Sequence, residues 1–246
     1  MDSSSDINFS PTIEDGLWIL FKENVAPRVS SNSLDLTDIN ILELGPGEKS
    51  IFENRDWNLF YGRPNSIVAL DKNVAKIVAL PGELPPLPND FLNYVQGDIT
   101  EKIPGGEYQL IFDSHCIHCL IDAEDRAKAW KNIFNALRPG GRVAGEMMVA
   151  HKFMQFNPPF FYAEAERILY KIVGETLRPL RKILSHLEVE QEILSAGFEI
   201  EYFFFAKGRK FSFDPAYEYA WKTDPDCLLW IAKKPSVVIC SRTHPN

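Results

Sequence analysis

The sequence lacks the features that mark a secreted or membrane-spanning protein. Its 246 residues include only four cysteines, too few to suggest a disulfide framework. Residues 1–10 are polar and acidic, without the apolar segment of a signal peptide. No apolar run approaches the roughly 20 residues that a membrane span requires. These absences predict a cytoplasmic protein with no membrane partner.

Positively charged residues are fewer than negatively charged ones. The chain has 26 Lys and Arg residues against 34 Asp and Glu residues, which gives a net charge of −8. Because binding to nucleic acid requires clustered cations, this balance argues against a nucleic-acid partner. Two short basic clusters lie at residues 178–182 and 207–210, and we interpret the first as a solvated helix face or helical turn.

Strand and helix patterns alternate along most of the chain. Apolar segments bounded by turn residues predict strands at residues 40–44, 66–70, 94–96, 110–112, 142–149, 198–205 and 228–232. Helical spacing predicts helices at residues 13–29 (broken by Pro27), 73–80, 123–137 and 187–196. This alternation predicts an α/β fold, a parallel sheet with helices on both faces. Since no helix separates the last two strands, we expect one of them to run antiparallel.

The first predicted strand ends in a glycine turn, Gly45-Pro46-Gly47. Glycine at positions 45 and 47 lets the backbone turn sharply and approach a ligand closely. Asp71 ends the second strand, where a carboxylate can accept hydrogen bonds from two ribose hydroxyls. A dinucleotide-binding turn would need glycine or alanine where Ser50 stands. The pattern favours a ribose-bearing ligand without a pyrophosphate over NAD or ATP; the alternative is a tight turn that binds nothing.

Five short motifs occur in an order that resembles the class I S-adenosylmethionine-dependent methyltransferases. They lie at residues 43–47, 68–71, 96–99, 110–113 and 137–141. The family fold is a three-layer, doubly wound sheet of seven strands, mostly parallel with an antiparallel last strand. We therefore expect a methyltransferase domain at residues 39–246, an N-terminal helical lid at residues 1–38 and a cap inserted at about 150–186.

The resemblance also implies which residues bind S-adenosylmethionine. Glu43, Gly45 and Gly47 would shape the site for the methionine and ribose portions, and Asp71 would hold the ribose hydroxyls. Glu48 departs from the family pattern, because many members have a third glycine at this position.

The remaining cofactor-binding candidates follow the third and fourth strands. Asp98, with the backbone of Ile99, would meet the adenine, whose exocyclic amine can donate to a carboxylate. Asp113 and Ser114 would line the methionine end. For each of these acids the alternative is a solvated carboxylate in a turn.

A cluster of histidines and cysteines follows the fourth strand. Because His115 and His118 interleave with Cys116 and Cys119 in one short segment, the four side chains are not expected to converge on a zinc ion. We therefore predict no metal, and interpret both cysteines as small buried hydrophobic residues. The resemblance to the methyltransferases implies that His118 packs under the sheet. His115 is a candidate general base, with a core or helix-capping histidine as the alternative.

Aromatic residues gather at residues 153–162 and 202–221. Inserts in this fold lie beside the cofactor crevice, and aromatic walls suit a small apolar or aromatic molecule. A second small core is the alternative. The sequence thus predicts a methyltransferase that acts on O or N of such a molecule and releases S-adenosylhomocysteine. The alternatives are a methyltransferase acting on protein or RNA, a non-catalytic S-adenosylmethionine-binding regulator and an NAD-dependent oxidoreductase.

Overall fold

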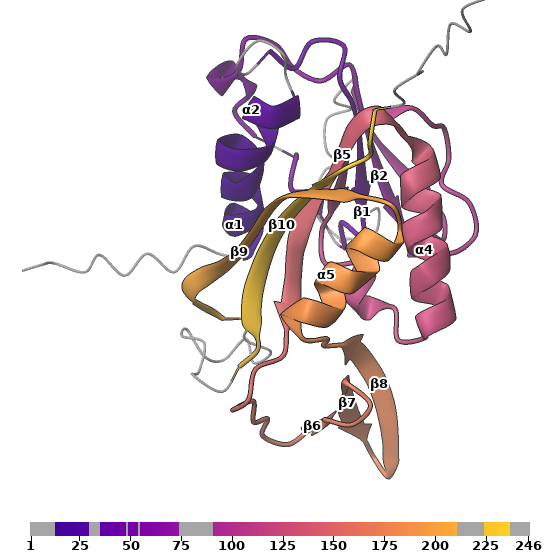
Figure 1. Ribbon diagram of the computed structural model, residues 1–246, viewed down its shortest axis with the longest axis vertical. Helices are drawn as coiled ribbons and strands as arrows, with labels where there is room; N and C mark the ends of the chain where they lie inside the picture. The colour runs from indigo at the N-terminus through magenta and orange to yellow at the C-terminus, as the bar shows by residue number, and fades with distance from the viewer. Residues whose placement is uncertain are drawn as a thin grey trace, which may run out of the picture.

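A seven-stranded sheet forms the centre of the molecule, with strand order β3-β2-β1-β4-β5-β10-β9 (Figure 1). The computed structural model describes residues 13–29, 35–47, 49–53, 55–73, 91–210 and 224–236. The strands of this sheet are β1 (Asn40–Leu44), β2 (Ser66–Asp71), β3 (Leu92–Gln96), β4 (Tyr108–Asp113), β5 (Leu137–Val149), β9 (Glu199–Lys210) and β10 (Asp226–Lys233).

The direction of the strands follows the prediction. The first five strands pair in parallel, whereas β10 runs antiparallel to both of its neighbours, β5 and β9. The α/β class and the antiparallel last strand are therefore confirmed. The helix expected at residues 73–80 lies almost entirely outside the described residues.

Helices cover both faces of the sheet and complete three layers (Figure 1). One face carries α1 (Ile13–Leu20), a π-helical turn (Phe21–Val25) and α2 (Ala26–Val29). The other face carries α4 (Ala123–Ala136) and α5 (His186–Ser195). On the first face Trp18 and Phe21 pack with Phe52, Phe60 and Phe112, so the N-terminal helices are part of a continuous aromatic core.

The N-terminal helical segment continues through Pro27, where the sequence predicted a break. Upstream of the proline, the Ala26 N–H bonds to the Phe21 carbonyl, an i→i−5 contact that belongs to the π-helical turn. Proline lacks an N–H group and its ring crowds the carbonyl four residues earlier. The wider π turn lies directly before it, a usual place for a local adjustment of the helix.

The expected insert is a small antiparallel sheet of its own, formed by β6 (Phe160–Ala163), β7 (Ile168–Val173) and β8 (Thr176–Lys182). The interpretation of residues 178–182 as a helix face or turn is wrong, because they form the end of β8 and pair with β7. The segment forms a strand because β8 pairs with β7, and this contact between strands outweighs the local sequence pattern.

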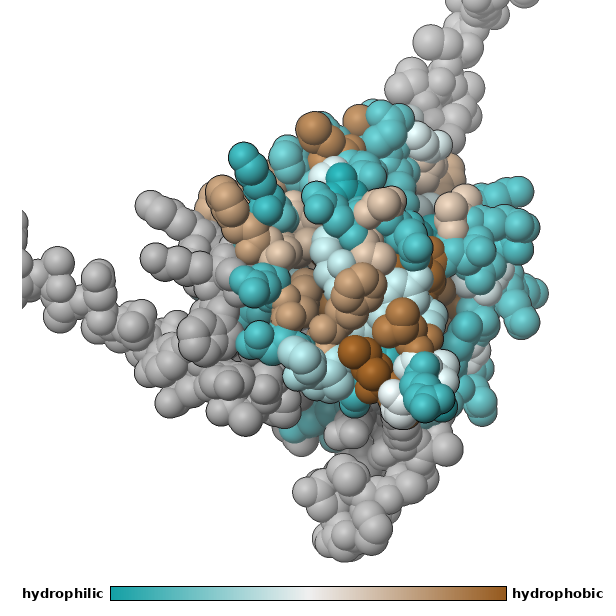
Figure 2. Space-filling model, turned by 90° about the horizontal axis from the view of Figure 1, so that it is seen from below, coloured by the Kyte–Doolittle hydropathy of each residue, from teal (hydrophilic) through white to brown (hydrophobic). Residues whose placement is uncertain are grey.

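The aromatic side chains of residues 153–162, which lead into and form β6, divide between two environments. Phe156, Phe160 and Tyr162 pack against a small buried cluster of Met148, Leu169, Ile183 and Cys227. Phe153 and Phe161 are instead 70% and 49% exposed. Figure 2 views this end of the molecule and shows apolar side chains gathered among polar ones. The second aromatic segment, residues 202–221, is described only up to residue 210. Within the described ranges, no helix is both long and apolar enough to cross a membrane.

Candidate active site

The candidate site residues follow the carboxyl ends of four adjacent strands. Leu44, the last residue of β1, pairs with Leu70 of β2 and with Asp113 of β4. Asp71 of β2 in turn pairs with Gln96, the last residue of β3. Because the strand ends are in register, the structure brings the glycine turn, Asp71, Asp98 and the Asp113–Ser114 pair to one edge of the sheet.

The glycine turn and Asp71 are joined by hydrogen bonds. Gly45 and Gly47 have φ values of +63° and +68°, in the left-handed region that favours glycine. The Gly47 N–H donates to Asp71 Oδ2 at 3.3 Å, and the Asn73 N–H donates to Oδ1 at 2.8 Å. Each carboxylate oxygen keeps a further lone pair for a ligand hydroxyl. A Cβ built on residue 47 would meet no atom within 4 Å, so the turn opens toward space that a ligand can fill.

Glu43 is buried near the end of β1 and binds the segment that follows the glycine turn. Its Oε1 accepts hydrogen bonds from the Ile51 N–H at 3.0 Å and the Ser114 hydroxyl at 2.7 Å, and its Oε2 accepts one from Ser50. Burial raises the pKa of Glu43 to about 7, although these three donors oppose the rise. Glu43 thus joins the segment after β1 to the residue after β4.

Asp113 is also buried, and it holds the turn that follows β4. Its Oδ1 accepts hydrogen bonds from the backbone N–H groups of Cys116 at 2.7 Å and Ile117 at 3.1 Å. No described residue donates to its Oδ2, which is buried as well. Burial raises the pKa of Asp113 to about 7, against the effect of these two N–H donors.

Asp98 is already engaged by neighbouring side chains. Its Oδ1 accepts from the Thr100 N–H at 2.9 Å and the Thr100 hydroxyl at 2.8 Å, and Lys72 Nζ lies 2.6 Å from Oδ2. Partial burial raises the pKa of Asp98, but the bonds from Lys72 and Thr100 outweigh it and hold the pKa below its usual value. Ile99 is buried, and its carbonyl accepts from Asn132 Nδ2 at 2.9 Å.

The histidines and cysteines after β4 are arranged as two stacked rings and two separate thiols. His115 adopts a φ of +68°, and its ring stacks on His118 with centroids 5.6 Å apart. His118 is fully buried, and burial holds its pKa well below the usual value, so the ring is neutral. Cys116 is half-buried and packs against the main core, whereas Cys119 is exposed, so the expectation of a small buried residue is wrong for Cys119. The described ranges contain no group of three His, Cys, Asp or Glu side chains suited to a metal ion.

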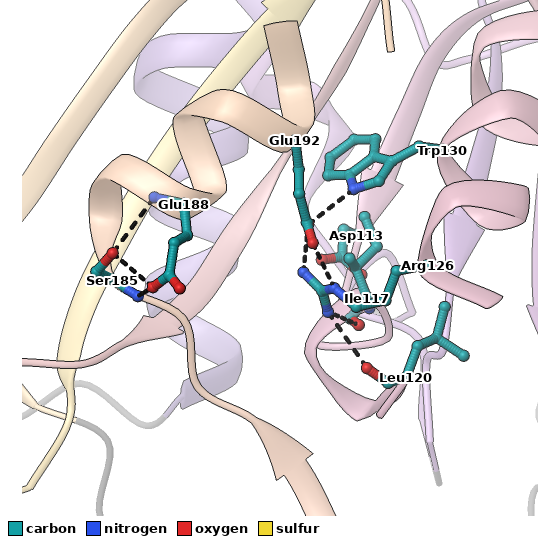
Figure 3. A network of polar contacts seen from close by, with 8 residues as sticks. All are labelled: Asp113, Ile117, Leu120, Arg126, Trp130, Ser185, Glu188 and Glu192. Atoms are coloured by element: carbon teal, nitrogen blue, oxygen red, sulfur yellow. Dashed lines mark hydrogen bonds and ion pairs between the residues drawn. The ribbon is translucent and has the colours of Figure 1, made fainter. Parts of the chain in front are cut away.

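An ion pair that sequence analysis missed lies next to this turn. Arg126 of α4 is 1% exposed and binds Glu192 of α5 as well as two backbone carbonyls of the turn (Figure 3). The sequence carried a signal for it, because Arg126 falls in the apolar stripe of α4, in line with Trp130 and Ile133. A cation at such a position requires a hydrogen-bonded partner of opposite charge.

The chain is similar to known proteins in part of its sequence and in its fold. Residues 42–145 match the family model described as a methyltransferase domain. No curated protein sequence matches the chain.

Three of the solved structures that share the fold illustrate the likeness. The CcbJ methyltransferase from Streptomyces caelestis has a TM-score of 0.60 and 13% identity, over 91% of this chain and 96% of that one. An S-adenosylmethionine-bound amino pentose methyltransferase from Micromonospora echinaspora has a TM-score of 0.57 and 13% identity, over 92% of both chains. The 1,6-didemethyltoxoflavin-N1-methyltransferase from Burkholderia thailandensis has a TM-score of 0.56 and 15% identity, over 94% of this chain and 82% of that one. At these identities the likeness is one of fold.

Proposed function

Since the chain carries a class I S-adenosylmethionine-dependent methyltransferase domain, we propose that it methylates an oxygen or nitrogen atom of a small, apolar or aromatic molecule. The observation that carries the cofactor assignment is the pairing of the glycine turn with Asp71 at the carboxyl end of the sheet. A carboxylate fixed there by a backbone N–H retains acceptor sites for two ribose hydroxyls.

The proposed roles of the other residues follow from their contacts. Glu43 shapes the floor of the site through Ser50 and Ser114, and Gly45 lets the chain pass close to the turn after β4. Asp98 accepts a hydrogen bond from the adenine amine at its Oδ2. This oxygen would give up its ion pair with the exposed Lys72, or accept from the amine and Lys72 together. Ile99 would contribute its backbone beside Asp98.

The methyl donor supplies an electrophilic carbon on a positively charged sulfur. The protein's task is to hold the acceptor atom in line with that carbon, at about 3–3.5 Å, and to keep water away. Asp113 and Ser114 form the wall at the methionine end. His115 lies two residues beyond β4 and is the candidate that takes the proton from the acceptor's oxygen or nitrogen.

A small acceptor is supported by two features. The small sheet β6–β8 lies against the turn Ile117–Cys119 at the end of β4, which brings an aromatic-rich element close to the proposed methionine end. Two of the structural neighbours act on small molecules, since one is named for an amino pentose and another binds 1,6-didemethyltoxoflavin with S-adenosylhomocysteine. We propose that this small sheet is the cap over the acceptor.

Two binding titrations test the cofactor assignment. Calorimetry with S-adenosylhomocysteine should give one site per chain, whereas NAD should give no heat of binding under the same conditions. Absence of S-adenosylhomocysteine binding by folded protein would contradict the proposal.

A product assay then tests the acceptor class. S-adenosylhomocysteine release should follow addition of a small phenol, amine or carboxylic acid from a panel. Methyl transfer to protein or RNA alone would reject the small-molecule assignment and leave the cofactor site standing, and cofactor binding without transfer to any acceptor would favour a regulator.

A further inference from the structure

A buried guanidinium connects three separate parts of the chain beside the proposed site. Arg126 Nε and Nη2 both bind the carboxylate of Glu192, at 2.8 Å and 2.5 Å, which joins α4 to α5. Its Nη1 donates to the carbonyl of Ile117 at 2.7 Å and, more weakly, to that of Leu120 at 3.4 Å. Figure 3 shows the guanidinium between Glu192 on one side and the turn on the other.

The partner carboxylate is itself fixed in orientation. Trp130 Nε1 donates to Glu192 Oε2 at 3.1 Å, from one turn further along α4 than Arg126. A planar guanidinium with two bonds to one carboxylate has little rotational freedom, so the remaining nitrogen points in a defined direction. Lysine cannot reproduce this arrangement, because its ammonium is a single point of charge.

The turn that receives this nitrogen is held from both sides. Asp113 accepts the N–H groups of Cys116 and Ile117 on the side of the sheet, and Arg126 donates to the carbonyls of Ile117 and Leu120 on the side of the helices. A short 3₁₀ turn leaves several backbone groups without partners within the turn. Asp113 and Arg126 together bind four backbone groups of the turn, of which one, the Ile117 carbonyl, also accepts the Leu120 N–H at 3.1 Å within the turn.

The position of the turn matters because Cys116 touches the glycine turn. A Cβ on residue 45 would lie 2.7 Å from Cys116 Cβ, so the two segments are as close as glycine permits. Any movement of the 116–120 turn therefore changes the space beside Gly45. The same turn follows directly on Asp113, Ser114 and His115.

We propose that Arg126 and Glu192 are positioning residues, which hold the 116–120 turn against the glycine turn and thereby set the affinity for the methyl donor. Neither side chain needs to touch the donor. This inference rests on the proposed function, because it assigns the donor to the crevice beside Gly45. It also explains why a buried arginine is paired here with the partly exposed Glu192, since ion pairs removed from water by themselves often add little net stability.

Single substitutions provide the first test, measured as calorimetric affinity for S-adenosylhomocysteine together with a melting curve. Arg126→Gln and Glu192→Gln should each weaken affinity about tenfold or more, as expected for the loss of charge-assisted hydrogen bonds. Arg126→Lys keeps the charge and should recover only part of the affinity. The control is Ser185→Ala, which removes the capping box of α5 (Ser185 with Glu188) and should lower Tm while leaving affinity within about twofold.

A double variant separates positioning from mere stability. Arg126→Met with Glu192→Leu replaces the ion pair by apolar side chains, a change that often restores stability. We expect this variant to melt close to the wild type yet bind S-adenosylhomocysteine as weakly as Arg126→Gln, because nothing replaces the bonds to Ile117 and Leu120. Recovery of affinity together with Tm would overturn the inference.

The outcomes also separate this inference from the proposed function. A wild-type protein that fails to bind S-adenosylhomocysteine rejects both. Wild-type binding with unchanged affinity in folded Arg126→Gln or Arg126→Lys rejects the positioning role alone.

Discussion

Replacement of Asp71 tests the proposed cofactor site at the residue with the most direct role. In Asp71→Ala the Gly47 N–H and the Asn73 N–H both lose their acceptor, and the two proposed ribose hydroxyls lose theirs as well. Charge-assisted hydrogen bonds of this kind contribute about 1.5–3 kcal/mol to binding in total after solvent competition. The affinity for S-adenosylhomocysteine should therefore fall between about 10-fold and 150-fold.

The effect on stability must be separated from the effect on binding. Asp56→Ala is a matched control, because Asp56 Oδ1 accepts from the Asn58 N–H at 3.0 Å in the same geometry as Asp71 with Asn73, outside the candidate site. Both variants should lose about 1 kcal/mol of stability or less. Only Asp71→Ala should lose affinity in calorimetry. Wild-type affinity in a folded Asp71→Ala protein would remove Asp71 from the ribose site.

Three further predictions follow from burial and packing. The pKa values of Glu43 and Asp113 rise from below 5 to about 7 on folding, so the folded state retains protons that the unfolded chain releases. The free energy of unfolding should therefore fall as pH rises from about 4.5 to 7, by up to about 1.4 kcal/mol per pH unit for each group. A plot of Tm against pH should be flatter for Glu43→Gln than for the wild type. Phe160→Ala should cost about 3 kcal/mol of unfolding free energy and Phe161→Ala about 0.5 kcal/mol, because of these two only Phe160 packs on the small core. Equal losses of stability in the two variants would contradict this packing. Loss of turnover in Phe161→Ala at unchanged S-adenosylhomocysteine affinity would place the Phe161 ring at the acceptor. Metal analysis of untagged protein should find well below one zinc per chain, and a full equivalent that disappears when both cysteines of the 115–119 segment are replaced would refute this.

The positions of the strands in the large sheet, and their parallel or antiparallel directions, were largely predictable because the sequence signals are local. A buried apolar run followed by glycine or aspartate marks the ends of β1 and β2, and the predicted bounds 40–44 and 66–70 agree with the structure to within one residue. The small sheet β6–β8 was not predictable in the same way. Its strands carry charged and aromatic residues without strict alternation, and they exist because they pair with one another.

The candidate site shows the same division between local and distant causes. Gly45, Gly47 and Asp71 were identified from the sequence, because a left-handed turn and a strand-end carboxylate depend on neighbouring residues alone. The burial of Glu43 and Asp113 was not, since it depends on how far the adjoining strands and turns exclude water. Their raised pKa values are properties of the assembled edge of the sheet.

The burial of Arg126 can be predicted from the sequence of α4 alone, whereas its partner cannot. Its place in the apolar stripe of α4 indicates a buried cation, but its partner Glu192 lies 66 residues further along the chain and reaches it only when α5 packs beside α4. The helix pair thus aims the guanidinium at the carbonyls of Ile117 and Leu120. If this arrangement sets the space beside Gly45, then substitutions in α5 that remove or displace the Glu192 carboxylate, far from any proposed ligand atom, alter donor affinity through the 116–120 turn. A comparison of affinity with stability across α5 variants therefore tests the dependence of the site on its supporting helices.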